Sequence, residues 1–113
     1  MPNKQIDLLN ITIRGVYKDS DSYLNYAREN VFGFVFLFNQ KKNKHDEDEM
    51  KKLTEQLVKI AIKCEGTYYL PYRLHIDKET FRIVYPQGDE FFKLKSKYDP
   101  NGIFKNKFYE HYK

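Results

Sequence analysis

The sequence predicts an α+β protein: a ferredoxin-like β-α-β-α-β sheet with helices on one face and a short helical C-terminal extension. Two observations carry this prediction. Segments with apolar residues at every second position, typical of strands, alternate with segments of three- and four-residue periodicity, typical of helices. The 113 residues suffice for one compact domain with its own core. Within that domain we expect a sheet unit over residues 1–76 and the helical extension over residues 77–113.

The first two expected elements are a strand and a short helix. The strand covers residues 10–17, in which Ile11 and Ile13 share one face and Arg14 lies on the other. An Asp-Ser-Asp run then offers side chains of the kind that cap helix N-termini, which predicts a short helix over residues 19–29.

Residues 31–38 form an uninterrupted apolar run with phenylalanine at every second position. A strand that is apolar on both faces is usually central and covered on both sides, and we expect this place for residues 31–38. Alternatively, one of its faces forms the floor of a pocket or an interface. Residues 32–35 (FGFV) also match the middle of an RNA-binding signature in which sheet aromatics stack on bases. The flanking positions differ from that signature, so a packed strand is favoured over RNA binding.

The clearest predicted helix covers residues 47–65. Its apolar residues recur at three- and four-residue steps: Met50, Leu53, Leu57, Ile60, Ala61 and Cys64. Asp46 and Glu49 have the spacing of a capping box at the start, and Gly66 stands where a C-terminal glycine cap belongs. Because Cys64 continues the apolar stripe, we expect a buried structural thiol.

The remaining elements are a broken strand and three short helices. The strand covers residues 67–76, and Pro71 implies an edge, a bulge or a change of direction within it. Helices follow over residues 77–84, 90–97 and 103–113, the first two beginning with aspartates in cap positions.

Composition excludes several classes of protein. An aromatic content of 17% rules out a disordered chain, and the longest apolar run is too short to span a membrane. A single cysteine and an N-terminus without an apolar signal segment indicate a cytoplasmic protein. The net charge of +4 is uneven, because residues 91–113 hold six basic and two acidic side chains. Such a tail suits a polyanion, but a solvated helical face gives the same count.

The sequence contains no complete catalytic apparatus. The three histidines and the single cysteine lack metal-ligand spacing, so we expect no metal site. The five glycines are isolated from one another, which excludes a glycine-rich phosphate loop. A small independent enzyme is therefore disfavoured.

The densest polar and aromatic cluster covers residues 68–75 (YYLPYRLH). On an extended segment Arg73 and His75 would share a face, with Tyr72 on the opposite one. A guanidinium group beside an imidazole could orient an anionic or hydroxylated substrate, or stabilise charge on a cofactor. The alternative interpretation is that both are surface residues of an edge strand.

The cluster at 68–75 and the C-terminal tail together resemble the C-terminal end of FAD-linked oxidases of the vanillyl-alcohol-oxidase type, which include sugar-alcohol and aldonolactone oxidases. The tail pattern is F-x-x-L-K-x-x-Y-D-P-x-G-x-F-x-N-x-F. It is matched by Phe91 or Phe92, Leu94, Lys95, Tyr98, Asp99, Pro100, Gly102, Phe104, Asn106 and Phe108. The segment before residue 66 resembles the substrate (cap) domain of the same proteins more weakly.

The resemblance implies a partial flavoenzyme. Its family binds most of the FAD in an N-terminal domain, for which this sequence has no counterpart, while the cap domain builds the substrate pocket. Residues 1–76 would then be a cap-domain-like unit whose partner is a flavin-binding domain or chain of the same enzyme. Alone, the chain would be inactive, would not hold FAD tightly, and could self-associate as a homo-oligomer through apolar surface. A stand-alone module that binds RNA or another polyanion is the alternative.

The resemblance also implies site residues. Arg73 and His75 fall where sugar-alcohol oxidases carry a basic residue and a histidine near the flavin, and they are the candidates for a catalytic role. Arg14 falls where related enzymes carry an arginine on a cap-domain strand, although Thr12 replaces the glutamate of that pattern. Arg14, Tyr72, Arg73 and His75 are the candidate contacts for substrate or cofactor.

Overall fold

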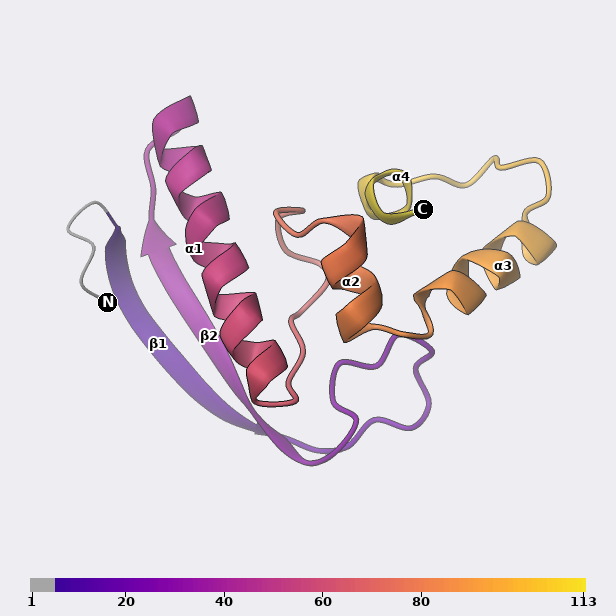
Figure 1. Ribbon diagram of the computed structural model, residues 1–113, viewed down its shortest axis with the longest axis horizontal. Helices are drawn as coiled ribbons and strands as arrows, with labels where there is room; N and C mark the ends of the chain where they lie inside the picture. Colours follow the sequence, from indigo (N-terminus) through magenta and orange to yellow (C-terminus); the bar gives the residue numbers. More distant parts are fainter. Residues whose placement is uncertain (1–5) are drawn as a thin grey trace.

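Two antiparallel strands and four helices make up the structure, a computed structural model that describes residues 6–113. They are β1 (Asp7–Val16), β2 (Val31–Asn39), α1 (Lys44–Lys63), α2 (Lys78–Val84), α3 (Gly88–Tyr98) and α4 (Lys107–Tyr112). Figure 1 shows the β1–β2 hairpin and α1 at one end of the molecule and the three short helices at the other. The fold is therefore α+β, as predicted.

The hairpin pairs β1 with β2 in an antiparallel register that places Ile11 opposite Phe36 and Ile13 opposite Phe34. Opposite residues of such a pair point to the same face, so isoleucines and phenylalanines line one face together. The register shifts near the start of β1, between Leu8 and Asn10. Both strands were predicted. The central position expected for β2 is wrong, because the described residues form a sheet of two strands only.

The prediction of a helix over residues 19–29 is wrong. Turns and bends join the two strands there, because the Asp19 carboxylate accepts the N–H groups of Asp21 and Ser22 at 2.9 and 3.1 Å. An aspartate that binds nearby backbone in this way competes with helix formation. The Asp19 N–H also donates to the Ala27 carbonyl at 2.8 Å, which closes the loop.

Helix α1 begins three residues earlier than expected and has a different cap. Asn43 is the N-cap, and its side chain accepts the N–H of Asp46 at 2.8 Å. The proposed capping box of Asp46 and Glu49 is therefore wrong, because Asp46 already lies in the first turn. There its negative charge interacts favourably with the positive end of the helix macrodipole.

The C-terminus of α1 also differs from the expectation. Glu65, with φ of 57°, takes the left-handed conformation that was assigned to glycine, and the Gly66 N–H donates to the Ala61 carbonyl at 2.7 Å. The left-handed conformation of Glu65 and this hydrogen bond together form a Schellman-type ending. Cys64 is exposed rather than buried, because it is the C-cap residue at which the helical stripe ends.

Residues 67–76 do not form the expected strand. The segment bends at Pro71, and the His75 N–H donates to the Arg73 carbonyl at 3.0 Å, so these backbone groups are not offered to the sheet. Its apolar side chains pack on the helices instead, where Ile76 is buried and Tyr68 lies against the same core. Within residues 6–113 a third strand is thus missing, and the ferredoxin-like β-α-β-α-β order is not confirmed.

Helices α2 and α3 fall within two residues of the expected ranges, whereas α4 begins at Lys107, four residues later than expected. Asp77 caps α2 by accepting the Thr80 N–H at 2.7 Å, as predicted, and Asn106 caps α4 in the same way. Asp89 does not cap α3; it lies in the first turn and pairs with Arg82 at 2.8 Å.

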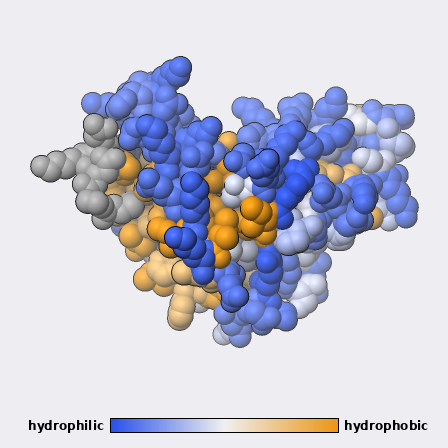
Figure 2. Space-filling model, viewed as in Figure 1, coloured by the Kyte–Doolittle hydropathy of each residue, from blue (hydrophilic) through white to orange (hydrophobic). Residues whose placement is uncertain are grey.

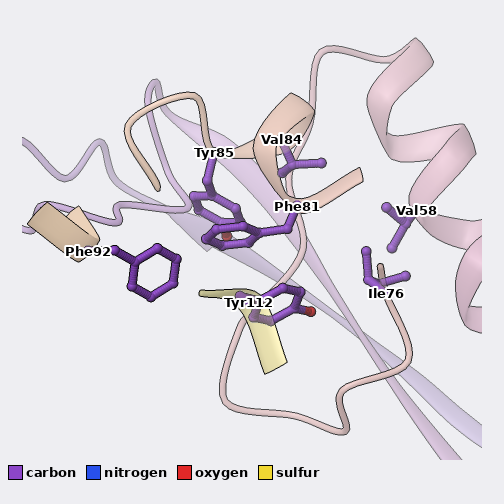
Figure 3. Packing of buried hydrophobic residues seen from close by; sticks show 7 residues of the cluster. All are labelled: Val58, Ile76, Phe81, Val84, Tyr85, Phe92 and Tyr112. Carbon is purple, nitrogen blue, oxygen red and sulfur yellow. The ribbon is translucent and has the colours of Figure 1, made fainter. Parts of the chain in front are cut away.

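The core is an aromatic cluster centred on Phe81, which is fully buried (Figure 3). Its buried members are Val58, Ile76, Phe81, Val84, Tyr85, Phe92 and Tyr112. Val58 comes from α1 and Ile76 from the segment that precedes α2, and the others come from residues 77–113. The sheet unit and the helical extension therefore share one core.

Candidate functional site

The candidate residues Arg73 and His75 meet at one carboxylate, that of Glu47 in the first turn of α1. Arg73 Nη1 forms an ion pair with Glu47 Oε2, and His75 Nε2 lies 2.8 Å from Glu47 Oε1. An ionised carboxylate can only accept hydrogen bonds, so Nε2 of His75 carries a proton in this contact. The two side chains predicted from the segment 68–75 are thus brought together by a third residue that sequence reasoning missed.

Two neutral side chains complete the network. Gln40 follows β2; its amide donates to Glu47 Oε2 at 2.9 Å and accepts from Arg73 Nη1 at 3.0 Å. Thr54, two turns further along α1 than Glu47, places its hydroxyl 3.3 Å from His75 Nδ1. The network therefore connects three parts of the fold: the end of the hairpin, α1 and the segment before α2.

The electrostatics of the network favour an ionised carboxylate. The hydrogen bond from His75 holds the pKa of the Glu47 carboxyl below its usual value, and Gln40 and the charge of Arg73 act in the same direction. His75 is buried, with 9% of its surface exposed, whereas the Arg73 side chain is 59% exposed. Arg73 can therefore present guanidinium N–H groups to an external anionic or carbonyl oxygen while Glu47 holds it in place.

The arrangement of Thr54, His75 and Glu47 has the residue types of a hydrolytic triad but not its geometry. The Thr54 hydroxyl donates to the Met50 carbonyl at 2.8 Å, the preceding turn of its own helix. A nucleophile must instead give its proton to the base. We assign the network a binding and orienting capacity rather than nucleophilic catalysis.

The other two candidates lie apart from this network. Arg14 stands on β1 opposite Gly33, and among the described residues no hydrogen bond or ion pair joins it to Glu47, Arg73 or His75. Tyr72 is exposed, and its ring packs on Tyr69 with the centroids 5.2 Å apart.

Clusters of metal-ligating side chains and long apolar helices were both sought in residues 6–113. This part of the chain brings together no group of three histidine, cysteine, aspartate or glutamate side chains that could hold a metal ion. It also has no helix with the length and apolar character needed to cross a membrane.

Comparison of the chain with protein-family models, with curated proteins and with solved structures gave no match.

Replacing Glu47 with glutamine tests how the network contributes to stability. Because the folded-state pKa of Glu47 is lowered, its ionised form stabilises the fold fully above its ordinary value of 4.5. That contribution is lost as the pH falls through the lower folded-state pKa. We expect Glu47→Gln to lower the free energy of unfolding at neutral pH by at most about 1 kcal/mol, since the carboxylate is half exposed. Denaturant unfolding between pH 7 and pH 3 should then show a flatter acid dependence than in the wild type.

The matched control is Glu90→Gln, which removes the same charge from an exposed pair with Lys93 and leaves the network intact. If both variants change the acid dependence equally, net charge rather than the network is responsible.

Proposed function

We propose that the chain is the C-terminal, substrate-domain part of an FAD-dependent oxidoreductase, with the FAD-binding domain supplied by another domain or chain. The family comes from the resemblance alone, and the structural observation that supports a missing partner domain is the unusually large surface of the chain. Its accessible surface is 8813 Å², about a third more than the roughly 6,600 Å² expected for a compact protein of this mass. The radius of gyration is 15.7 Å, against about 13 Å for a compact chain of this length.

The hairpin presents several exposed apolar side chains. Phe32 and Phe34 are 74% and 57% exposed, and Ile13, opposite Phe34, is 60% exposed. Figure 2 shows apolar residues gathered over the hairpin below α1. A two-stranded hairpin is only marginally stable in water, and exposed apolar patches of this kind mark contact surfaces. In the complete enzyme we propose that further strands extend this hairpin and restore the ferredoxin-like order.

The C-terminal pattern divides into residues that build this fold and residues that do not. Asp99 has a local role: its carboxylate pairs with Lys95 and accepts the N–H groups of Ile103 and Phe104 at 2.9 and 3.0 Å. Tyr98 and Phe104, by contrast, are more than three-quarters exposed. Such aromatics contribute little to packing within this chain, which supports a role in contact with a flavin-binding domain.

The Glu47–Arg73–His75 network gives this proposal its chemistry. FAD, held by the partner domain, would supply the hydride-accepting chemistry, which places negative charge beside this network. Arg73 is exposed and held by Glu47, so its positive charge could stabilise that negative charge, and His75 would keep Glu47 oriented. Arg14 and Tyr72 would act as outer contacts with substrate. A cytoplasmic location belongs to the same proposal.

The experiment is to isolate the native polypeptide from its source cells with an antibody against this chain. We expect a band several times heavier than 13.7 kDa, or a second polypeptide in constant ratio, and release of FAD when the material is denatured. Cells that lack the gene serve as the control. A lone 13.7 kDa polypeptide without flavin would contradict the proposal.

A binding module for RNA or another polyanion is the second candidate, and one observation favours it. A groove of about 230 Å³ at the C-terminal end is lined by Phe104, Phe108 and Tyr109 with Lys95 and Lys105. Aromatic rings between lysines suit a single-stranded nucleic acid. Fluorescence anisotropy with single-stranded RNA at two salt concentrations tests whether the chain binds nucleic acid, since phosphate contacts are strongest at low salt. The absence of binding at low salt would remove this candidate.

A further inference from the structure

The outer edge of β1 has no partner strand within residues 6–113. The sheet there consists of β1 and β2 only, and no loop or cap hydrogen bond of these residues involves the backbone of β1. In Figure 1 all four helices lie on the β2 side of the hairpin. An open strand edge presents N–H and C=O groups that can pair with another strand. Proteins commonly protect such an edge with proline or lysine, and β1 contains neither.

The side chains of β1 are as accessible as its edge. Only Leu8 and Val16 are partly buried, and the other eight residues of this ten-residue strand are exposed. The exposed residues include three large apolar side chains, those of Leu9, Ile11 and Ile13. A long edge strand with exposed apolar side chains is a typical site of association with another chain.

The register with β2 determines which side chains of β1 share a face of the sheet. Leu8, Ile11 and Ile13 each lie opposite a phenylalanine of β2, so these three residues share one face. Asp7 and Arg14 share the other face, although an odd number of positions separates them along the strand. The register shift between them inserts one extra residue into β1 and restores the match. The acidic and the basic side chain of β1 therefore point the same way.

A second copy of β1 matches this edge in an antiparallel register centred on Ile11. Directly opposite residues of an antiparallel pair point to the same face, and this register unites residues of one face throughout. It also joins apolar with apolar, polar with polar and acidic with basic side chains. The pairs are Ile11 with Ile11, Asn10 with Thr12, Leu8 with Ile13 and Asp7 with Arg14.

The neighbouring register is less complementary. A pairing centred on Thr12 would place Asp7 opposite Val16 of the second copy, and Arg14 opposite Asn10. Neither charge would then face its opposite directly. Opposite charges placed directly across an antiparallel pair stabilise it, so the charges select the register centred on Ile11.

The two charges are available for this contact. Among the described residues Arg14 has no ion-pair partner, and Asp7 accepts only a hydrogen bond, from the neutral Asn39 amide at 3.1 Å. Two-fold symmetry forms the contact between Asp7 and Arg14 twice. Each copy carries a net charge of +4, so two copies repel each other at long range. Local opposite charges then decide which surfaces can meet.

We propose that two copies of this chain associate through their β1 strands, antiparallel and centred on Ile11, to form a four-stranded sheet in the order β2–β1–β1–β2. Such a sheet passes the three strands that independent stability requires, whereas a lone hairpin is marginal. The edge of β2 stays open, so the further strands proposed for the complete enzyme can join there. The inference does not rest on the proposed flavoenzyme function. Arg14 is the one residue common to both, and here it contacts the second copy rather than substrate.

The first measurement is sedimentation equilibrium of the purified chain over a wide range of concentrations, in which we expect reversible dimer formation. Arg14→Asp should raise the dissociation constant by about tenfold, because symmetry replaces two attractions with two repulsions. Combining Asp7→Arg with Arg14→Asp exchanges the charges and should restore the affinity. Lys59→Asp makes the same change of net charge at an exposed position of α1 and is the control. It should leave the dissociation constant nearly unchanged.

The register is tested by disulfide formation in a Cys64→Ser background, since Cys64 is exposed and could cross-link by itself. Ile11→Cys places the two new thiols directly opposite each other. Cα atoms of such a pair are about 4.5–5.5 Å apart, which a disulfide can span. We expect mild oxidation to give a covalent dimer. Ile13→Cys, on the same face and similarly exposed, is the matched control. It would lie about four residues, or roughly 13 Å, from its twin and should not cross-link.

Three results would overturn the proposal. A chain that stays monomeric up to about 1 mM would leave the β1 edge to a strand of another domain or chain. Equal cross-linking of Ile11→Cys and Ile13→Cys would exclude the register, and equal weakening by Lys59→Asp would attribute association to net charge. If Ile11→Cys loses its folded spectrum, the charge-exchange variants decide alone. Neither flavin content nor the mass of the native polypeptide is read here, so this inference and the proposed function can fail independently.

Discussion

Replacing Phe81 with alanine is expected to destabilise the fold by about 3–5 kcal/mol, the usual cost of removing a buried aromatic side chain. Phe81 is fully buried and packs against rings from α3, from α4 and from the C-cap of its own helix. Its ring stacks on Tyr112 with centroids 4.4 Å apart and on Tyr85 at 5.6 Å. Phe108 meets it edge to face at 5.9 Å. The truncation would therefore leave a cavity that several rigid rings cannot collapse to fill.

The measurement is thermal and denaturant unfolding followed by circular dichroism. Small domains are stable by only about 5–15 kcal/mol, so the variant should be partly unfolded at 37 °C or unfold at a much lower denaturant concentration. Ile83→Ala, in the same helix but 64% exposed, is the control and should change stability by less than about 0.5 kcal/mol. If the two variants proved equally stable, Phe81 would not be the centre of the core.

The same packing explains why position 88 is a glycine. A Cβ atom at this position would lie 2.6 Å from Cε1 of Phe81, closer than carbon atoms approach in folded proteins. Glycine is needed there because the start of α3 passes directly over the buried ring. Periodicity can locate the turn between α2 and α3, but it cannot reveal a close approach between two elements.

Local sequence patterns were sufficient to predict an element where a continuous apolar face runs along it. The two strands and α1 were predicted within a few residues, because alternation and a three- to four-residue stripe persist along each of them. The ends of α1 were less accurate. Asn43 competes with Asp46 for the cap, and Glu65 takes a left-handed conformation that the sequence assigns to Gly66. At both ends the structure is set by local hydrogen bonds, from the Asp46 N–H to Asn43 and from the Gly66 N–H to Ala61.

The two errors of element type have different origins. Residues 67–76 are rich in aromatic and apolar side chains that favour strands, yet a strand requires an open edge to pair with. Here the side chains of Tyr68 and Ile76 gain more by packing on the Phe81 cluster. The loop at residues 19–29 has caps and apolar residues suited to a helix, but Asp19 binds its own backbone instead. Tertiary packing overrode local preference at residues 67–76, whereas a local contact between the Asp19 side chain and nearby backbone did so at residues 19–29.

The candidate site was predicted in part. Arg73 and His75 do act on one side of their segment, but the residue that joins them, Glu47, lies far away in the sequence. Glu47 reads as an ordinary acidic residue in the first turn of a helix, where negative charge is common. A useful signal would have been that a histidine and an arginine two residues apart need a carboxylate partner when one of them is buried. The sequence alone does not say which of the sixteen acidic residues supplies it.

Dividing the chain after Ile76 is expected to leave neither piece folded, although the sequence divides there into a sheet unit and a helical extension. The buried members of the Phe81 cluster lie on both sides of this point: Val58 and Ile76 before it, and Phe81, Tyr85 and Tyr112 after it. Residues 77–113 alone fall below the roughly 40 residues at which single cores usually become stable. Residues 1–76 would retain the hairpin and α1, with their apolar surface exposed still further.

The measurement is a comparison of the two separate pieces with their equimolar mixture. Each piece alone should give a collapsed proton NMR spectrum and no cooperative thermal transition, with some residual helix from α1 in the first piece. The mixture should recover dispersed signals if the complementary surfaces find each other, and Phe81→Ala in the second piece should prevent that recovery. A first piece that unfolded cooperatively by itself would show instead that the hairpin and α1 form an independent unit. The exposed hairpin would then be able to dock on a partner without the helical extension.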